Sequence, residues 1–204
     1  GAYLLWGGSL GRAAATALAT RLFEPGLDPI PTPFIGLFMV EGLFRYHRDD
    51  QALAFIREYW GNMLSRGATT CWEHFALGWP GGLVSNSSLC HGWSACPVYS
   101  LPAHVLGVQP LEPGFSKVLI EPQLGDLAWA EGEVPTQYGT VHVRWSREGE
   151  PLRLLVELPP GCSGRVVLPK AGGQPIVLNG QVHAPSSGLD VSPGVHTITA
   201  VMAS

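Results

Sequence analysis

The stretch from Gly67 to Pro97, GATTCWEHFALGWPGGLVSNSSLCHGWSACP, holds the residues whose types could do chemistry. It contains a carboxylate, Glu73, and an imidazole, His91. Three indoles accompany them, at Trp72, Trp79 and Trp93. Carboxylates move protons, imidazoles donate hydrogen bonds to hydroxyl groups, and flat indole rings cover the apolar faces of a sugar. This mixture is what a carbohydrate-cleaving pocket needs.

Each of these residues also has a plain structural interpretation. A glutamate in a loop, such as Glu73, is often solvated or caps a helix, and His91 could be a satisfied histidine beside a turn glycine. Trp72 could belong to the core, and a core position is favoured for Trp93 because a predicted helix begins there. Trp79, in GWPGG, fits a loop residue at the cleft.

The cysteines have no spacing typical of a metal site or a disulfide scaffold. They occur at Cys71, Cys90, Cys96 and Cys162, with no close CxxC pair, so free thiols are expected. A metal site made with His74 and His91 was considered because three thiols flank the central stretch. The spacings match no common ligand pattern, and we predict no metal.

Composition narrows the function classes. The chain has 204 residues, 46% hydrophobic and 14% charged, with 26 glycines and 18 prolines, which is typical of a globular protein rich in turns. Its net charge is −4 and no basic run occurs, so the electrostatic footprint of a nucleic-acid binder is missing. We therefore expect neutral ligands and no nucleic-acid partner.

The sequence carries no targeting or membrane signal of its own. No run of about 18 apolar residues occurs, so no membrane span is predicted, and no basic then apolar leader is present. A cytoplasmic and a secreted location both stay open. The chain opens without methionine on GAYLLW, residues 1–6, which suggests a piece of a longer polypeptide.

Apolar residues at intervals of three and four predict helices throughout the amino-terminal half. The predicted helices cover residues 10–23 and 34–46, a third begins at a cap on Asp49 or Asp50, and a fourth runs over residues 93–106. Gly67 suits the left-handed position that closes the third helix. The fourth helix should kink or restart at Pro102, since proline removes a backbone donor.

The carboxy-terminal half alternates between polar and apolar residues instead. The strand-like segments are residues 117–121, 140–146, 152–158, 165–168, 175–178 and 197–202. Asn179-Gly180 between two apolar pairs predicts a hairpin. We expect an antiparallel β-sandwich, with Glu131 and Glu133 on a solvated face, so that the whole chain is α+β in two parts.

Three runs of residues resemble a known family. They are YWGNMLSRGATTCWE at residues 59–73, SLCHGWSACPVYSLPAHVLGVQPLEPGF at 88–115 and GDLAWAEGEVPTQYGTVHVRW at 125–145. In this order they resemble the carboxy-terminal part of bacterial α-L-rhamnosidases of glycoside hydrolase family 78. The resemblance implies the end of an (α/α)6 barrel over residues 1–107 and a carboxy-terminal β-sandwich over residues 108–204. The barrel is incomplete, with about four helices where six hairpins need about twelve.

The resemblance also implies roles for particular residues. The glutamate that ends the family's GATT-x-WE motif is the general base of an inverting hydrolysis, and here it is Glu73. The histidine of the HGW motif lies in the sugar pocket, and here it is His91. Trp72 and Trp93 would help to wall the site. The general acid comes from earlier barrel loops, which this chain does not contain.

Three function hypotheses fit these residues. The first is a glycosidase that removes terminal α-L-rhamnose from glycosides or polysaccharides by inversion, without a cofactor. The second is a non-catalytic carbohydrate-binding or accessory module, and the third is a remnant that braces a neighbouring domain. Under the first, we expect little hydrolysis by this chain alone, and either self-association or a need for its missing amino-terminal part.

Overall fold

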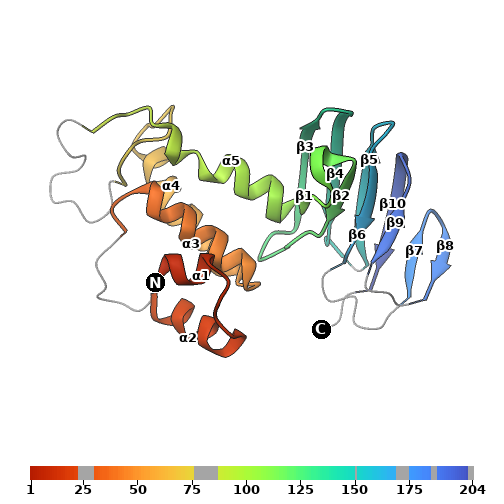
Figure 1. Cartoon of the computed structure of the whole chain (residues 1–204), viewed down its shortest axis with the longest axis horizontal. Helices are drawn as coiled ribbons and strands as arrows, with labels where there is room; N and C mark the ends of the chain where they lie inside the picture. Colours follow the sequence, from red (N-terminus) through yellow and green to blue (C-terminus); the bar gives the residue numbers. More distant parts are fainter. Residues whose placement is uncertain (23–29, 76–86, 150, 169–174, 185–187, 202–204) are drawn as a thin grey trace. The chain divides into compact units, whose positions relative to one another are not determined.

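The computed structural model describes residues 1–22, 30–75, 87–149, 151–168, 175–184 and 188–201. The chain divides into two compact units, Gly1–Ser100 and Leu101–Ser204. The first, which we call the helical unit, consists of helices and loops, and the second, the sheet unit, is built on two β-sheets (Figure 1). This order agrees with the α+β class expected from the sequence. The assignment of residues 1–107 and 108–204 to a barrel portion and a sandwich domain stays a prediction.

The helical unit contains the predicted helices and one more. Its elements are α1 (Ala2–Trp6), α2 (Arg12–Leu22), α3 (Pro33–Arg45) and α4 (Asp49–Ser65). The short α1 was not predicted. Gly67 has φ +83° and ends α4 as expected. The predicted cap on α4 is wrong, because Arg48 occupies the N-cap position. Asp49 and Asp50 lie in the first turn instead, where negative charge interacts favourably with the positive end of the helix dipole.

The core of the helical unit forms where α3 meets its neighbours. Gly42 allows α1 to approach closely, since a Cβ added there would lie 2.5 Å from the Cβ of Leu5. A buried aromatic cluster joins α4 to the loop that follows it, through Phe55, Tyr59, Trp60 and Phe75. None of the helices in the described part of the chain is long and apolar enough to cross a membrane.

The predicted helix at residues 93–106 is divided into three pieces. A 3₁₀ turn, η1 (Gly92–Ser94), leads to α5 (Cys96–Ser100), which continues as a π-helical turn, η2 (Leu101–Val105). A kink or restart was expected at Pro102, and the structure instead shows a change of helix type that begins at Leu101. Pro102 has no N–H to donate to the helix. After it, the amide of Leu106 donates to the carbonyl of Leu101, five residues back, at 3.2 Å, which is the hydrogen bond of a π-helical turn.

The sheet unit contains ten strands among its described residues, arranged in two sheets. One sheet has the order β1-β2-β6-β9 and the other β3-β4-β5-β10-β7-β8. The bounds are β1 (Val108–Pro110), β2 (Lys117–Ile120), β3 (Trp129–Thr136), β4 (Gly139–Ser146), β5 (Leu152–Leu158), β6 (Ser163–Val166), β7 (Ile176–Leu178), β8 (Gln181–His183), β9 (Leu189–Val191) and β10 (Gly194–Ala200). The larger sheet is antiparallel throughout, whereas β2 and β6 pair in parallel, which the sequence did not predict.

Most strand predictions are confirmed. Each predicted segment contains a strand, although Met202, the end of the last segment, lies outside the described residues. Asn179 and Gly180 both have positive φ, at 50° and 81°, and join β7 to β8 in the predicted hairpin. The Asn179 side chain accepts from the amide of Thr197 and lies 3.1 Å from Nδ1 of His196.

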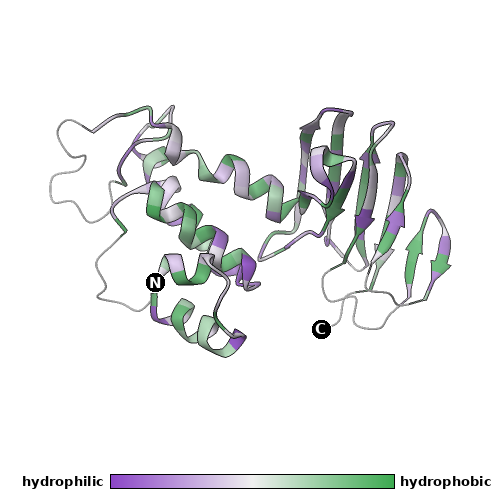
Figure 2. Ribbon diagram, viewed as in Figure 1, coloured by the Kyte–Doolittle hydropathy of each residue, from purple (hydrophilic) through white to green (hydrophobic). Residues whose placement is uncertain are grey.

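Alternation along the strands builds the core of the sheet unit (Figure 2). Val141, Val143 and Trp145 on β4 are fully buried, and the residues between them face outward. A Cβ added at Gly164 on β6 would lie 3.0 Å from Leu158 on β5, so the inner faces of the two sheets pack together. Trp145 is satisfied there, because its Nε1 donates to the carbonyl of Val105 at 2.8 Å.

Candidate active site

Two short segments of the helical unit pair and bring the predicted site residues together. The amide of His91 donates to the carbonyl of Cys71, and the amide of Glu73 donates to the carbonyl of Ser88, both at 2.9 Å. Thr70 adds a side-chain hydrogen bond to the carbonyl of Leu89. Glu73 and His91 are therefore carried by one backbone ladder, although they are distant in the sequence.

The Glu73 carboxylate is held by one of its oxygens. Oε2 accepts a hydrogen bond of 2.9 Å from the amide of Ser88, and the side chain is half-buried. Among the described residues, Oε1 has no hydrogen-bond partner. An ionised carboxylate anchored in this way keeps one oxygen that can accept a proton from a water molecule.

His91 and Trp93 stand side by side at the start of η1. Their ring centroids are 4.3 Å apart, and the carbonyl of His91 accepts from the amide of Ser94 at 3.0 Å. Trp93 is 45% exposed, so the core interpretation favoured for it does not hold in this unit. An imidazole beside an open indole face is suited to bind a hydroxyl group and to cover an apolar ring face.

The remaining indoles of the stretch differ from Trp93. Trp72, next to Glu73, is buried, with 6% exposure, so it supports the loop from within. Trp79 lies outside the described residues. The roles predicted for both residues in substrate binding stay predictions.

Two hydrogen bonds fix the His91 segment to the helices behind it. Trp60 on α4 donates from Nε1 to the carbonyl of Ser94 at 2.8 Å, in a buried position. Ser100 on α5 donates from Oγ to Oε1 of Glu41 on α3 at 2.6 Å. Neither Trp60 nor Glu41 was predicted from the sequence, because each bond joins residues far apart in the chain and no local sequence motif indicates such a contact.

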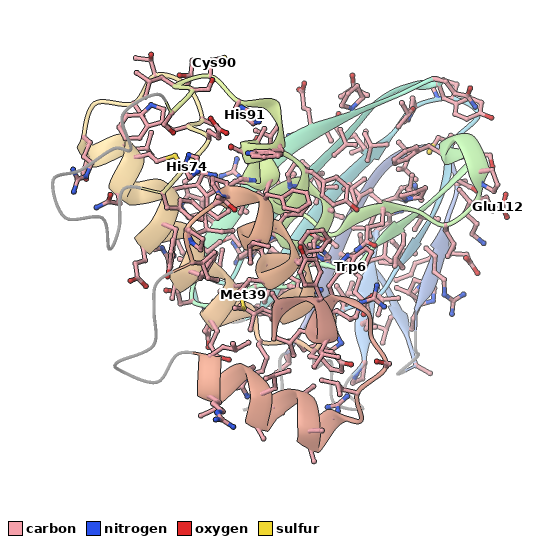
Figure 3. The ribbon with its side chains drawn as sticks, turned by 60° about the vertical axis from the view of Figure 1, so that its left-hand side comes forward. Trp6, Met39, His74, Cys90, His91 and Glu112 are labelled. Atoms are coloured by element: carbon pink, nitrogen blue, oxygen red, sulfur yellow. The ribbon has the colours of Figure 1, made fainter. Side chains whose placement is uncertain are left out.

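His74 was given no role from the sequence, and the structure places it at the same ladder. Its Nδ1 lies 2.7 Å from Oγ of Ser87, the residue before Ser88. His74, Cys90 and His91 lie at the same end of the helical unit (Figure 3). This contact ties together the two segments that carry Glu73 and His91.

A row of aromatic rings, exposed except for the half-buried Phe38, extends from Trp93 across α3 to α1, and we call it the aromatic stripe. Its ring pairs are Phe34 with Trp93 at 5.3 Å, Phe34 with Phe38 at 5.3 Å, Trp6 with Phe38 at 5.1 Å and Tyr3 with Phe38 at 4.6 Å. Tyr3 and Trp6 are 51% and 46% exposed. The spacing of Phe34 and Phe38, four residues apart on a helix, could have indicated this row.

The thiols near the site differ in reactivity. All four cysteines are free, with Cys90 exposed and Cys71 half-buried. Burial, opposed by the hydrogen bond to Ser100 and helped by the charge of Glu41, raises the pKa of the Cys96 thiol to about 12. No cluster of three histidine, cysteine or carboxylate residues that could hold a metal occurs in the part of the chain that the structure describes.

The chain is similar to α-L-rhamnosidases both in sequence and in structure. Residues 107–183 match the family profile described as the bacterial alpha-L-rhamnosidase C-terminal domain. The chain is 34% identical over 117 residues to an alpha-L-rhamnosidase of Alteromonas sp. (strain LOR). That match covers 54% of this chain and 12% of the relative, so the chain spans a small part of the relative's length.

Solved structures of similar fold cover more of the chain. The GH78 family rhamnosidase of Bacillus sp. GL1 is 35% identical, with a TM-score of 0.71, over 83% of this chain and 18% of its own. The α-L-rhamnosidase of Aspergillus terreus is 25% identical, with a TM-score of 0.75, over 93% of this chain and 21% of its own. The chain thus resembles the carboxy-terminal part of α-L-rhamnosidases, as the sequence motifs indicated.

Proposed function

We propose that this chain is the carboxy-terminal portion of an inverting α-L-rhamnosidase and that Glu73 is its general base. The observation that carries the proposal is the Glu73 carboxylate, anchored through Oε2 to the amide of Ser88 and open at Oε1, on the ladder that also carries His91. The names of the relatives support the substrate class, a rhamnose-containing glycoside or polysaccharide.

The proposed reaction is a single displacement. Oε1 of Glu73 takes a proton from water, the water oxygen bonds to the anomeric carbon, and the bond from that carbon to the leaving oxygen breaks. The leaving oxygen receives its proton from a second carboxyl group, roughly 6.5 to 9.5 Å from the first. The family resemblance assigns that group to barrel loops upstream of these residues. The mechanism uses neither a metal nor a cofactor.

His91 and the indoles bind the sugar in this proposal. The imidazole of His91 donates a hydrogen bond to a sugar hydroxyl, and Trp93, whose ring lies 4.3 Å from it, covers an apolar face of the sugar. Trp72 supports Glu73 from the buried side of the loop. Trp79 keeps its predicted place in the pocket wall.

The same proposal makes this chain inactive when it is alone. Without the general acid, one half of the carboxyl pair is absent and proton transfer to the leaving group stops. We also propose that the aromatic stripe is covered either by the amino-terminal part of the same polypeptide or by a second copy of the chain.

The test is made in the full-length gene product. Glu73→Gln should lower kcat for an aryl α-L-rhamnoside by about 10²- to 10⁴-fold, because the amide cannot take the proton, and should leave the affinity for rhamnose little changed. Glu58→Gln, an exposed glutamate on α4, is the matched control and should keep full activity.

Two results would contradict the proposal. Full turnover by the Glu73→Gln protein would show that Glu73 is not the general base. Steady hydrolysis of the aryl rhamnoside by the isolated 204 residues would show that the chain holds both carboxyl groups.

A further inference from the structure

The outer face of the larger sheet is hollowed over its three central strands. The hollow, of about 440 Å³, is lined by residues of β4, β5 and β10 and by Glu148 in the turn after β4. The alternation of the strands turns six of these side chains outward: Arg144, Ser146, Arg153, Leu155, Thr197 and Thr199. It lies wholly within the sheet unit and shares no residue with the Glu73 site.

Strand register arranges these side chains in two rows. One row joins Ser146, Arg153 and Thr199, which face one another across β4, β5 and β10. Trp129 on β3 extends this row, because it pairs with Ser146. Directly opposed side chains lie about 5 Å apart at Cβ, so Trp129 lies beside Ser146, although it does not itself line the hollow. Trp129 is 54% exposed.

The second row carries charges that are already paired. Arg144 opposes Leu155, which opposes Thr197. One guanidinium nitrogen of Arg144 lies 3.7 Å from the carboxylate of Glu131, and Glu131 also lies 3.2 Å from Nε2 of His142. Glu131 is exposed, as expected. Its carboxylate pairs with Arg144, so the charge of Arg144 is largely balanced.

Arg153 differs from Arg144, whose guanidinium is paired with Glu131. Among the described residues, the guanidinium of Arg153 has neither an ion-pair nor a hydrogen-bond partner. It projects between two hydroxyl side chains, Ser146 and Thr199, which are half-buried. A planar fork of five donors placed in this way is suited to a bidentate carboxylate.

We propose that this hollow binds a saccharide that bears a carboxylate, such as a uronic acid unit in a polysaccharide. Arg153 takes the carboxylate, the hydroxyls of Ser146, Thr197 and Thr199 hydrogen-bond to sugar hydroxyls, and Trp129 stacks on the next ring. Glu148 accepts from a sugar hydroxyl on the opposite side. The site would hold a polymer to the protein and is independent of the proposed hydrolysis.

The proposal revises the expectation of neutral ligands. That expectation rested on the net charge of −4, which is a property of the whole chain. The charged residues that line the hollow are Arg144, Glu148 and Arg153, and because Arg144 is paired with Glu131, Arg153 is the cation that is left for an anionic ligand. Local charge decides which ligand is bound, and net charge bears on solubility.

The test measures binding of two probes to the 204-residue chain by calorimetry. An oligosaccharide of alternating rhamnose and uronic acid should bind, and a neutral rhamno-oligosaccharide of the same length should bind at least tenfold more weakly. Arg153→Ala should weaken binding of the acidic probe by about 10- to 100-fold, and Arg153→Lys by less, because one charge remains without the fork. Trp129→Ala should weaken both probes.

A matched control comes from the same face of the same sheet. Val195 on β10 is 62% exposed and does not line the hollow, so Val195→Ala should bind as the unchanged chain does. Three results would overturn the proposal: no binding of either probe at millimolar concentration, equal affinity for the two probes, or affinity unaffected by Arg153→Ala. Because Trp129 and Arg153 belong to the sheet unit, failure of this binding test leaves the Glu73 proposal untouched, and full turnover by the Glu73→Gln protein would leave the binding proposal untouched.

Discussion

Each unit holds a buried indole whose Nε1 donates to a backbone carbonyl, and the two units differ in how many large apolar side chains they leave exposed. Trp60 in the helical unit donates to the carbonyl of Ser94, and Trp145 in the sheet unit donates to the carbonyl of Val105, both at 2.8 Å. Around Trp145, the inner faces of two sheets close over the core. The helical unit that contains Trp60 leaves large apolar side chains exposed: Tyr3, Leu4, Trp6, Phe34, Leu64, Leu89, Trp93, Val98 and Tyr99.

Among its described residues, the sheet unit exposes fewer large apolar side chains: Leu111, Trp129, Tyr138, Val182, Val195 and Val201. A sandwich buries the apolar face of each sheet against the other and needs no further layer. A helix buries one stripe against each neighbour, and helices taken from a larger array keep stripes whose neighbours are elsewhere. We therefore expect the sheet unit to be the more stable unit in isolation and the helical unit to be the one that associates.

The largest expected effect is the loss of the Trp145 side chain. Trp145→Ala should destabilise the sheet unit by about 3 to 5 kcal/mol, because it leaves a cavity and an unpaired carbonyl at Val105. Urea unfolding followed by circular dichroism measures this. Trp145→Phe keeps most of the volume and serves as the control, with a smaller loss. If the alanine variant lost less than about 1 kcal/mol, the sheet core would not be the closed one described.

The matched change in the helical unit should have a smaller effect and a local one. Trp60→Phe removes the donor to Ser94 and should destabilise the unit by about 1 to 3 kcal/mol. Because this bond fixes η1, the paired segments should also open more often. Hydrogen exchange at the Ser88 amide, which bonds to Glu73, should therefore become faster. Unchanged exchange would mean that η1 is not held through Trp60.

The aromatic stripe gives a prediction about association. Replacing Tyr3 by Ser and Trp6 by Gln should shift the isolated chain toward monomer in sedimentation velocity, because these rings are about half exposed. Leu111→Gln is the control, since Leu111 is 44% exposed on the sheet unit. If the Tyr3→Ser, Trp6→Gln variant associated as strongly as the Leu111→Gln variant, the aromatic stripe would not be the surface through which copies of the chain associate.

The smallest effect is expected at two buried thiols, one in each unit. Burial raises the pKa of Cys162 as well as that of Cys96, so both thiols should resist iodoacetamide at pH 8. Exposed Cys90 should react first. Mass spectrometry after alkylation tests the order, and faster labelling of Cys96 than of Cys162 would show that the helical unit opens more readily. Labelling of both at the rate of Cys90 would contradict their burial.

Local sequence patterns predicted most of the elements. The period of α4 and the alternation of β4 and β5 were plain, because each element has one buried face. Strand β3 was missed, since its residues alternate between exposed and half-buried and include Gly132 and Pro135. The parallel pairing of β2 with β6 was missed because it depends on distant contacts.

The candidate site was predicted only in part. Residue types indicated Glu73 and His91, and the ladder that joins their segments agrees with a shared site. The anchor on Glu73 comes from a backbone N–H, which every residue type except proline has, so no sequence pattern marks Ser88. The burial of Trp72 and the exposure of Trp93 depend on packing with α3 and α4, which residue type alone does not specify.

The Asn179-Gly180 hairpin has a consequence for the chemical ageing of the protein. Asparagine before glycine loses ammonia with time, because the next backbone nitrogen attacks the side-chain carbonyl, and asparagine is among the thermolabile residues. Here Oδ1 accepts from the amide of Thr197 at 2.9 Å, and Nδ2 lies 3.1 Å from the ring of His196. These contacts hold both ends of the amide and hinder the rotation that the attack needs. The folded sandwich thus protects its most labile turn from the damage that an unfolded chain would accumulate.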